Sequence, residues 1–401
     1  MSGEFLPYGR QDIDASDLAA VAEALQSGYL TTGPRVGEFE TAFAKGVGAR
    51  HAVVSNSGTA ALHLACIALD LGPGDSVVVP AITFLATANA ARFCGAEVIF
   101  ADVDPDTGRL TAATFEAALA QHPAASVRAV LPVHLNGHCV DMPAIRAVAE
   151  PRGIAVIEDA CHAIGGRHQA GNNSSATVGS CALSELACFS LHPVKTITCG
   201  EGGVTTTNDE AAYRRMCTFR THGMVREPAE FLHTDLALDP DGTANPWYYE
   251  MQALGYNYRI TDFACALGSS QLKRLDRYGQ RRRDLAARYD RLLAPLAPVI
   301  RPVPPAPGDD PVLHLYAVLI DFAAIGRSRA AVMHDLKAAG IGTQVHYIPV
   351  NRQPYYRRLY GEIRLPGAEA YYARALSIPL YPTMQDADVD RVVDALQGLT
   401  R

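Results

Sequence analysis

One lysine of this sequence stands in surroundings where a solvated lysine would be out of place. Lys195 lies within residues 190–203, SLHPVKTITCGEGG, and neither a helix face nor an amphipathic strand explains its position. A partly desolvated amine near another cation has a lowered pKa and can form a Schiff base with an aldehyde. Taken alone, Lys195 is more simply interpreted as a solvated side chain, so its interpretation depends on the residues that accompany it.

Two further groups have residue types that suit a ligand. The stretch SNSGT, residues 55–59, lies between an apolar run and a helical pattern, so the amides of Gly58 and Thr59 would begin a helix and favour an anionic group. Asp159 ends the apolar run of GIAVIEDACH and would face the crevice at the carboxyl end of a buried strand, where it could hold a cation. Each group also has a simpler interpretation, because such residues are ordinary helix N-caps.

The order of the three groups narrows their interpretation. Pyridoxal phosphate needs a cup for its phosphate, an acid for its pyridinium nitrogen and an amine for its aldehyde, and the chain supplies them in that order. Ser190, Thr196 and Thr198 add hydroxyl groups around the lysine. Phe84, in PAITFLATAN, could stack on the pyridine ring or be an ordinary core residue. The sequence therefore predicts a pyridoxal phosphate site built around Lys195.

The elements that must position these groups follow from the apolar patterning. Short apolar runs alternate with helical patterns, which predicts an α/β fold with a mainly parallel sheet covered by helices on both faces. Apolar residues also recur at helical spacing near the N-terminus and in the second half of the chain. We expect strands at residues 51–54, 76–79, 97–100, 127–133, 154–157, 188–191 and 203–206, and helices at residues 12–25, 60–71, 261–288 and 328–339.

The later part of the chain indicates a second, smaller unit. The proline-rich stretch at residues 294–311 marks a domain transition, and beyond it HLYAVLIDF and GTQVHYIPV flank a helical pattern to form a strand and helix unit. Residues 226–252 look like an insertion rich in proline, aspartate and aromatic residues. We expect an N-terminal arm at residues 1–11, a large cofactor-binding domain at residues 12–265 and a small C-terminal domain at residues 266–401.

Composition excludes several classes of protein. The chain has 401 residues, of which 48% are hydrophobic, and its net charge of -7 comes from acidic and basic residues mixed along the sequence, so we expect no nucleic-acid partner. The most apolar region, residues 77–91, is too short and too polar to span a bilayer, so we expect no membrane partner. No expected strand is followed by G-x-G-x-x-G, which argues against a dinucleotide-binding oxidoreductase.

Cysteine usage and the N-terminus indicate the compartment. Nine cysteines stand singly, without a C-x-x-C pair, as is typical of small core residues in a reducing compartment. The N-terminal residues lack the pattern of a secretory signal, so we expect a cytoplasmic protein. His134, His138 and Cys139 lie close together in the sequence, but no second cluster of ligands accompanies them and we expect no metal site.

Five motifs together resemble one family of enzymes. NSGTAALHLA, PAITFLATANA, AVIEDACHAIGG, FSLHPVKTITCGEGGV and LGYNYRITDFACALGSSQL are similar to the sugar-nucleotide aminotransferases of the DegT/DnrJ/EryC1/StrS family, and the similarity runs from about Tyr8 to the C-terminus. The resemblance implies the fold type I architecture of pyridoxal-phosphate-dependent transferases, which is aspartate aminotransferase-like. We therefore expect a large domain with a mainly parallel seven-stranded sheet, a smaller C-terminal α/β domain, and a homodimer with shared active sites.

The resemblance also implies roles for individual residues. Lys195 would bind the cofactor covalently and carry protons, Asp159 would pair with the pyridine nitrogen, and His162 would neighbour the phenolic oxygen. His192 stays off the catalytic list, because it fits a turn before Pro193. The other expected contacts are Gly58, Thr59 and Ser190 at the cofactor phosphate together with Asn257 of a second subunit, Phe84 at the ring, and Tyr8, Tyr29, Leu30, Thr31, His346 and Tyr347 at the nucleotide sugar.

Finer motifs suggest a substrate. HPVKTIT followed by GEGG, RTHGM at residues 220–224 and QVHYIPV at residues 344–350 are most similar to the family's transaminases of pseudaminic acid synthesis. This similarity implies transfer of an amino group, with glutamate as the expected donor, to carbon 4 of a UDP-linked 4-keto-6-deoxy-N-acetyl hexose. Residues 167–180 and 350–353 depart from the family pattern near the expected substrate side, so these departures concern the sugar rather than the cofactor.

Three other functions remain as alternatives at this point. The chain could be a 3- or 4-aminotransferase for a different UDP- or dTDP-linked keto sugar. A sugar dehydratase of the same fold would carry histidine at the lysine position, and Lys195 argues against it. A non-catalytic regulator that binds the cofactor or a sugar nucleotide would be expected to carry a DNA-binding extension, and no helix-turn-helix pattern precedes Tyr8.

Overall fold

The expected strands assemble into one seven-stranded sheet. A computed structural model of the chain describes residues 4–171, 174–233, 235–306 and 308–400, so residues 1–3 of the expected arm lie outside the described residues. The strand order is β1-β9-β8-β5-β4-β2-β3, and β9 alone runs opposite to the other six strands of this sheet, as predicted for a mainly parallel sheet. The strands are β1 (His51–Ser55), β2 (Ser76–Pro80), β3 (Glu97–Ala101), β4 (Val127–Val130), β5 (Ala155–Asp159), β8 (Leu186–Ser190) and β9 (Gly203–Thr207).

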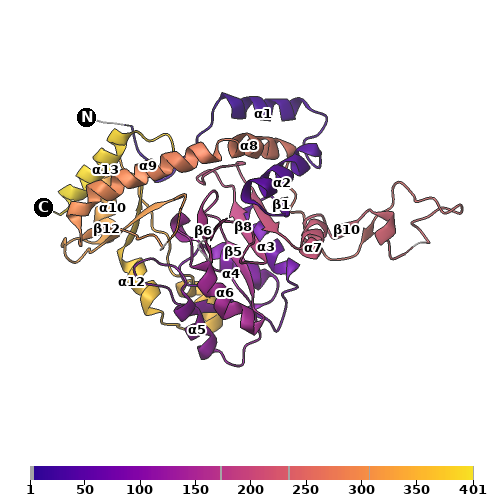
Figure 1. Cartoon of the computed structure of the whole chain (residues 1–401), viewed down its shortest axis with the longest axis horizontal. Helices are drawn as coiled ribbons and strands as arrows, with labels where there is room; N and C mark the ends of the chain where they lie inside the picture. Colours follow the sequence, from indigo (N-terminus) through magenta and orange to yellow (C-terminus); the bar gives the residue numbers. More distant parts are fainter. Residues whose placement is uncertain (1–3, 172–173, 234, 307, 401) are drawn as a thin grey trace.

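Helices cover both faces of this sheet (Figure 1). Along β2, Val77 and Val79 join one apolar core while Val78 joins another, which explains why the strand is apolar at successive positions. The core around Val77 includes residues of α3 and α4, and the core around Val78 includes residues of α5 and α6. These helices are α3 (Gly58–Ala68), α4 (Leu85–Phe93), α5 (Ala112–Gln121) and α6 (Met142–Ala149), with α2 (Pro34–Val47) and α7 (Glu210–Arg220) packed against β1.

The C-terminal part of the chain has its own core, called here the second core, which is separate from those of the large sheet and surrounds a small antiparallel sheet. Its strands are β12 (Ile300–Pro302), β13 (Tyr316–Ile320) and β14 (Ala375–Ile378), and residues of three helices pack with them. The division of the chain at residues 265 and 266 stays a prediction. The helices of this part are α9 (Leu275–Leu293), α10 (Arg329–Ala338), α11 (Pro354–Tyr360), α12 (Pro366–Arg374) and α13 (Asp386–Gly398), of which α9, α10 and α13 contribute to the second core.

Two expected elements differ from the structure. The single helix expected at residues 261–288 is two helices, α8 (Asp262–Leu272) and α9, because the backbone leaves the helical conformation at Arg274, whose guanidinium pairs with Asp14 and Asp17 at the start of α1 (Ala15–Gln26). The segment at residues 342–350 forms no strand; Gln344 makes an isolated bridge to Ser377, and β14 completes the small sheet instead.

Two surface segments correspond to the unusual stretches of the sequence. The expected insertion projects from the body of the molecule beyond β10 (Met224–Val225), which pairs with β11 (Glu250–Met251) (Figure 1). Part of residues 167–180 forms a hairpin of β6 (Arg167–Gly171) and β7 (Ser174–Thr177), while residues 172–173 lie outside the described residues.

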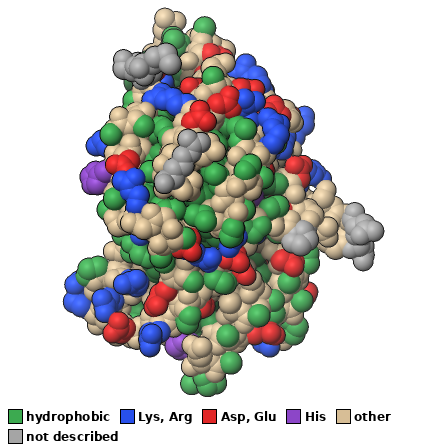
Figure 2. Space-filling model, turned by 90° about the vertical axis from the view of Figure 1, so that its left-hand side faces the viewer, with side chains coloured by type: hydrophobic (Ala, Val, Ile, Leu, Met, Phe, Trp, Pro, Cys, Tyr) green, Lys and Arg blue, Asp and Glu red, His purple; other side chains and the backbone are tan. Residues whose placement is uncertain are grey.

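On the face shown in Figure 2, acidic and basic side chains are interspersed. Within the described ranges, every helix is too short or too polar to cross a lipid bilayer.

Candidate active site

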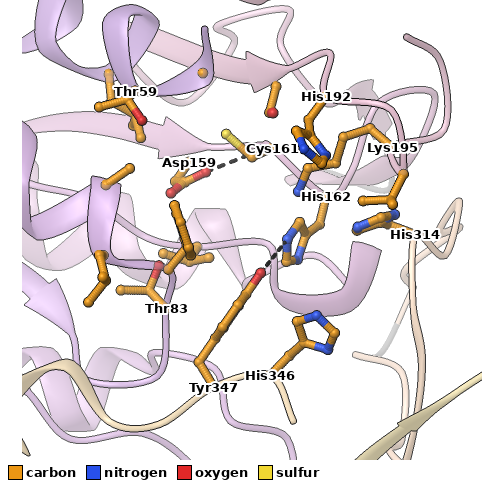
Figure 3. A pocket seen from close by; sticks show the side chains of 18 of the residues that line it. Thr59, Thr83, Asp159, Cys161, His162, His192, Lys195, His314, His346 and Tyr347 are labelled. Atoms are coloured by element: carbon orange, nitrogen blue, oxygen red, sulfur yellow. Dashed lines mark hydrogen bonds between the residues drawn. The ribbon is translucent and has the colours of Figure 1, made fainter. Parts of the chain in front are cut away.

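A cavity of about 1000 Å³ opens at the edge of the sheet where β1, β5 and β8 end. Strand ends of open α/β sheets are the usual place for a ligand, because loops and helix N-termini converge there. Figure 3 shows Lys195 and Tyr347 extending toward the space between Asp159 and His162. Ten of the expected site residues line this cavity: Tyr8, Gly58, Thr59, Phe84, Asp159, His162, Ser190, Lys195, His346 and Tyr347.

Lys195 presents its amine to this cavity from the turn that follows β8. Its backbone N–H donates to the carbonyl of His192 at 2.9 Å, which closes the turn. Burial lowers the pKa of the Lys195 amine, and the nearby Cys161 and Asp159 only partly oppose this effect. No ion pair engages the amine within the described part of the chain. A lowered pKa increases the fraction of neutral amine, which is the nucleophilic form.

Asp159 ends β5 with a carboxylate that is held from two sides. Thr87 Oγ1 donates to Asp159 Oδ2 at 2.6 Å, and the backbone N–H of Cys161 donates to Oδ1 at 3.2 Å. Thr87 is itself fixed by Thr83, whose hydroxyl lies 2.6 Å from its own. Asp159 is 4% exposed, and a buried carboxylate is costly unless a cation or several donors face it. The site therefore suits a ligand group with a protonated ring nitrogen.

The backbone around Gly58 forms a narrow cradle between the first turn of α3, the end of β8 and the start of β9. Ser57 caps α3 by accepting the N–H of Ala60 at 3.1 Å. A Cβ atom added at Gly58 would lie 2.8 Å from Cβ of Ser190, and one added at Gly203 would lie 2.2 Å from the carbonyl oxygen of Ser57. Only glycine permits these approaches, and they place the Ser190 hydroxyl beside the first turn of α3. Backbone amides and hydroxyls in this arrangement fit a phosphate group.

Gly58→Ala is expected to weaken binding of pyridoxal phosphate about tenfold, because the new methyl group would separate α3 from Ser190. Gly46→Ala is the matched control, since Gly46 lies on α2 with open space where a Cβ would be placed. The control should retain its affinity and gain about 0.5–1 kcal/mol of stability. Cofactor titration of both variants checks this, and equal affinities would contradict the cradle.

Aromatic and imidazole side chains form the opposite wall. His162 is buried, its Nδ1 accepts the backbone N–H of Asn136 at 3.2 Å, and its Nε2 lies 3.0 Å from the Tyr347 hydroxyl. Burial, with a smaller effect of Lys195, lowers the pKa of His162 well below its usual value. The rings of Tyr8 and His346 lie 5.4 Å apart, and those of Phe84 and Tyr347 lie 6.0 Å apart. This wall therefore presents neutral, partly apolar groups.

The buried histidines predict a loss of stability in mild acid. Burial lowers the pKa of His346 to about 3, with a smaller contribution from Lys195, whereas the unfolded chain would take up this proton below about pH 6.5. The unfolded state therefore binds more protons, and His346 alone should cost about 1.4 kcal/mol per pH unit as the pH falls from about 6.5 toward 3. Chemical denaturation at several pH values checks this, and His346→Gln should show a shallower decline. Equal slopes for the two proteins would contradict it.

Four expected site residues do not line the cavity. Asn257, Tyr29, Leu30 and Thr31 are exposed on the surface of the chain. Leu30 accepts the backbone N–H of Asp262 at 3.0 Å, and the carbonyl of Asn257 accepts the side-chain amide of Asn56 at 3.3 Å. Their predicted roles toward the cofactor phosphate and the sugar stay predictions.

Several cavity residues were not predicted from the sequence. Cys161, His314, Gln344 and Thr83 line the cavity, and Thr87 holds Asp159 from α4. The spacing of Thr83 and Thr87 by four residues at a helix start was a usable signal, because it places two hydroxyls on one side. His314 gave a weaker signal as the first residue of an apolar strand pattern.

Comparisons with known proteins agree with this geometry. The model of the DegT/DnrJ/EryC1/StrS aminotransferase family matches residues 11–397. The chain is 38% identical over 400 residues to the spore coat polysaccharide biosynthesis protein SpsC of Bacillus subtilis, covering 99% of this chain and 97% of that protein. The structure of Helicobacter pylori PseC, an aminotransferase involved in the biosynthesis of pseudoaminic acid, has a TM-score of 0.87 at 28% identity, with 99% of each chain covered.

Other solved structures show the same architecture. DesV of S. venezuelae, in complex with a ketimine intermediate, has a TM-score of 0.85 at 32% identity and covers 100% of both chains. Spr1654 of Streptococcus pneumoniae, in its PLP form, has a TM-score of 0.86 at 26% identity, covering 99% of this chain and 98% of that chain. With its cradle, acid and lysine in one cavity, the chain belongs to the DegT/DnrJ/EryC1/StrS aminotransferase family and is a fold type I, pyridoxal-phosphate-dependent sugar aminotransferase.

Proposed function

We propose that this enzyme transfers an amino group from glutamate to carbon 4 of a UDP-linked 4-keto-6-deoxy-N-acetyl hexose, in a pathway of the pseudaminic acid type. One observation carries the proposal: Lys195 and Asp159 face a single cavity whose other wall holds Tyr8, His346 and Tyr347. A cofactor bound between Lys195 and Asp159 would leave the wall with Tyr8, His346 and Tyr347 free to contact a sugar. The likeness to PseC supports this choice of substrate.

Each residue of the cavity has a separate role in the proposed reaction. The bound cofactor supplies an electron sink for the bond that is broken at the donor's alpha carbon. Lys195 would take up the proton of that carbon at Nζ and pass it on to the cofactor, a role that its lowered pKa favours. Asp159, oriented by Thr87 and by the N–H of Cys161, keeps a proton on the facing ring nitrogen. The cradle at Gly58 and Ser190 fixes the phosphate and so the position of the ring.

We also propose that the enzyme is a homodimer whose copies complete each other's sites. Tyr29 and Leu30 are neighbours in the sequence and are 58% and 52% exposed, and in this proposal the partner subunit covers them. In this proposal Asn257 reaches the cofactor phosphate of the partner subunit, and residues 29–31 contact its sugar. A cytoplasmic location is part of the same proposal and is supported by nine free cysteines, six of them buried.

The substrate proposal is tested with the enzyme converted to its amine-loaded form by glutamate. This form is then mixed with a panel of UDP- and dTDP-linked keto sugars, and turnover is read from the return of the cofactor's visible absorbance. We expect a response to UDP-linked N-acetyl 4-keto-6-deoxy sugars alone. A response only to another keto sugar supports the second candidate, an aminotransferase for a different nucleotide sugar, which the higher identity to SpsC favours. Protein that binds the cofactor but never bleaches with glutamate would instead be a non-catalytic binder.

A further inference from the structure

Asn136 is a buried residue just outside the active-site cavity, and it contacts two residues of the cavity wall, His162 and His314. Asn136 lies in the turn Leu135–Gly137 that follows β4, is 1% exposed, and has a left-handed backbone with φ of 64°. Asparagine adopts this conformation at lower cost than most residues. The next residue, Gly137, also has a positive φ, and a Cβ added there would lie 2.5 Å from the carbonyl oxygen of Val312. The loop is therefore pressed against the segment that enters β13.

Asn136 makes hydrogen bonds with three separate parts of the chain. Its backbone N–H donates to Nδ1 of His162 at 3.2 Å. Its carbonyl oxygen accepts the backbone N–H groups of His314 at 2.9 Å and Leu315 at 3.2 Å. Its side-chain Nδ2 donates to the hydroxyl of Tyr371 on α12 at 3.2 Å. These contacts fix the position and the direction of the N–H group that meets His162.

This N–H group determines the direction of the hydrogen bonds that follow. An imidazole nitrogen that accepts a hydrogen bond carries no proton, so the neutral ring of His162 carries its proton on Nε2. Nε2–H must then donate to the Tyr347 oxygen, which lies 3.0 Å away. The hydroxyl proton of Tyr347 is thereby left to point elsewhere, and the residue lines the cavity. Burial lowers the pKa of His162 and raises that of Tyr347, so both groups stay neutral near pH 7.

We propose that Asn136 is a positioning residue that holds His162 in its Nε2–H tautomer and so makes Tyr347 a hydrogen-bond donor toward an oxygen atom of the ligand in the cavity. The identity of that ligand rests on the proposed function, but the direction of the hydrogen bonds does not. Asn136 itself is separated from the cavity by His162 and touches no part of the ligand space described for the cofactor and the sugar.

The test measures the tautomer directly in the cofactor-loaded enzyme. Long-range proton–nitrogen NMR spectra of protein labelled with ¹⁵N-histidine separate a protonated ring nitrogen from an unprotonated one, and His162→Asn assigns the signals of His162. We expect Nε2 protonated and Nδ1 unprotonated near pH 7. A protonated Nδ1 on His162 would overturn the proposal at once, whatever substrate the enzyme uses.

Two variants test the role of Asn136 in holding this tautomer. Asn136→Gly keeps the backbone N–H and permits the positive φ, but it loses the bond to Tyr371; Tyr371→Phe loses the same bond and leaves Asn136 in place. In both variants we expect the two nitrogen shifts of His162 to move toward each other as the tautomers mix, and kcat to fall about tenfold with a smaller change in KM. The double variant should be no worse than either single one.

The outcomes separate this proposal from the proposed function. Unchanged His162 spectra in both variants would overturn the role of Asn136, even where the enzyme loses stability, because a purely structural role does not move the tautomer. Failure of the proposed sugar to react would leave the spectra as expected and would contradict only the substrate. Because Tyr371→Phe leaves the loop sequence intact, it keeps the test decisive if Asn136→Gly folds poorly.

Discussion

Lys195→Ala is expected to abolish both turnover and the visible absorbance of the lysine-bound cofactor. The variant retains the cradle at Gly58 and the acid at Asp159, so it should still bind the cofactor, but without the covalent bond. It also loses the group that carries protons at the donor's alpha carbon. Positioned acid–base groups contribute about 10²–10⁴-fold to a rate, and the loss of the covalent step adds to this, so activity should fall by at least about 10⁴-fold. Absorbance spectroscopy and a coupled assay for glutamate-dependent turnover measure the two effects.

The chain offers a matched control for this variant. Lys337 lies exposed on α10, away from the cavity, so its replacement by alanine removes a lysine without changing the site. Lys337→Ala should retain the absorbance and the full rate. A Lys195→Ala enzyme with normal absorbance and measurable turnover would refute the assignment of the lysine, and an equal loss in both variants would point to misfolding.

Asp159→Asn should lower turnover by about 10²–10⁴-fold with little change in fold. The amide has almost the same shape as the carboxylate: its oxygen can still accept the N–H of Cys161, and its NH₂ group can donate to the hydroxyl oxygen of Thr87 once that hydroxyl rotates. It carries no charge, however, so it cannot keep a proton on the facing ring nitrogen, and the cofactor becomes a poorer electron sink. Steady-state rates with saturating glutamate and cofactor measure the effect.

The neighbouring acid provides the control for Asp159. Glu158 precedes it on β5, is 1% exposed, and its carboxylate accepts from His134 and Ser184 rather than facing the cavity. Glu158→Gln turns an amide N–H₂ group toward these donors, so it should cost about 1–3 kcal/mol of stability. Its rate at a temperature where it is folded should stay near that of the parent enzyme. A larger loss of rate in Glu158→Gln than in Asp159→Asn would contradict the assignment of the acid.

The fold was largely predictable because its signals are local. The run Val77 to Val79 is apolar at successive positions, which indicates a strand covered on both faces, and the structure places it as β2, between β4 and the edge strand β3 of a mainly parallel sheet. The break between α8 and α9 was not predictable in this way. It depends on Arg274, which pairs with Asp14 and Asp17 from the opposite end of the sequence.

The candidate site shows the same division between local and distant signals. Gly58, Asp159 and Lys195 each follow or precede an apolar strand pattern, so their positions at one edge of the sheet could be inferred from their order. The groups that orient them come from remote parts of the chain: Thr87 reaches Asp159 from α4, and Asn136 reaches His162. No spacing in a single sequence encodes those contacts. Asn257 differs again, because its predicted contact is the cofactor phosphate of a second chain.

One measurement tests the central claim most directly. The cofactor-loaded enzyme is treated with borohydride, which makes the bond between the cofactor and its lysine permanent, and the modified peptide is identified by mass spectrometry. The chain has four lysines, Lys45, Lys195, Lys273 and Lys337, so the choice is limited. The structure predicts a phosphopyridoxyl group on Lys195 alone, in a stoichiometry close to one per chain. Label on another lysine, or none on Lys195, would contradict the account of the site.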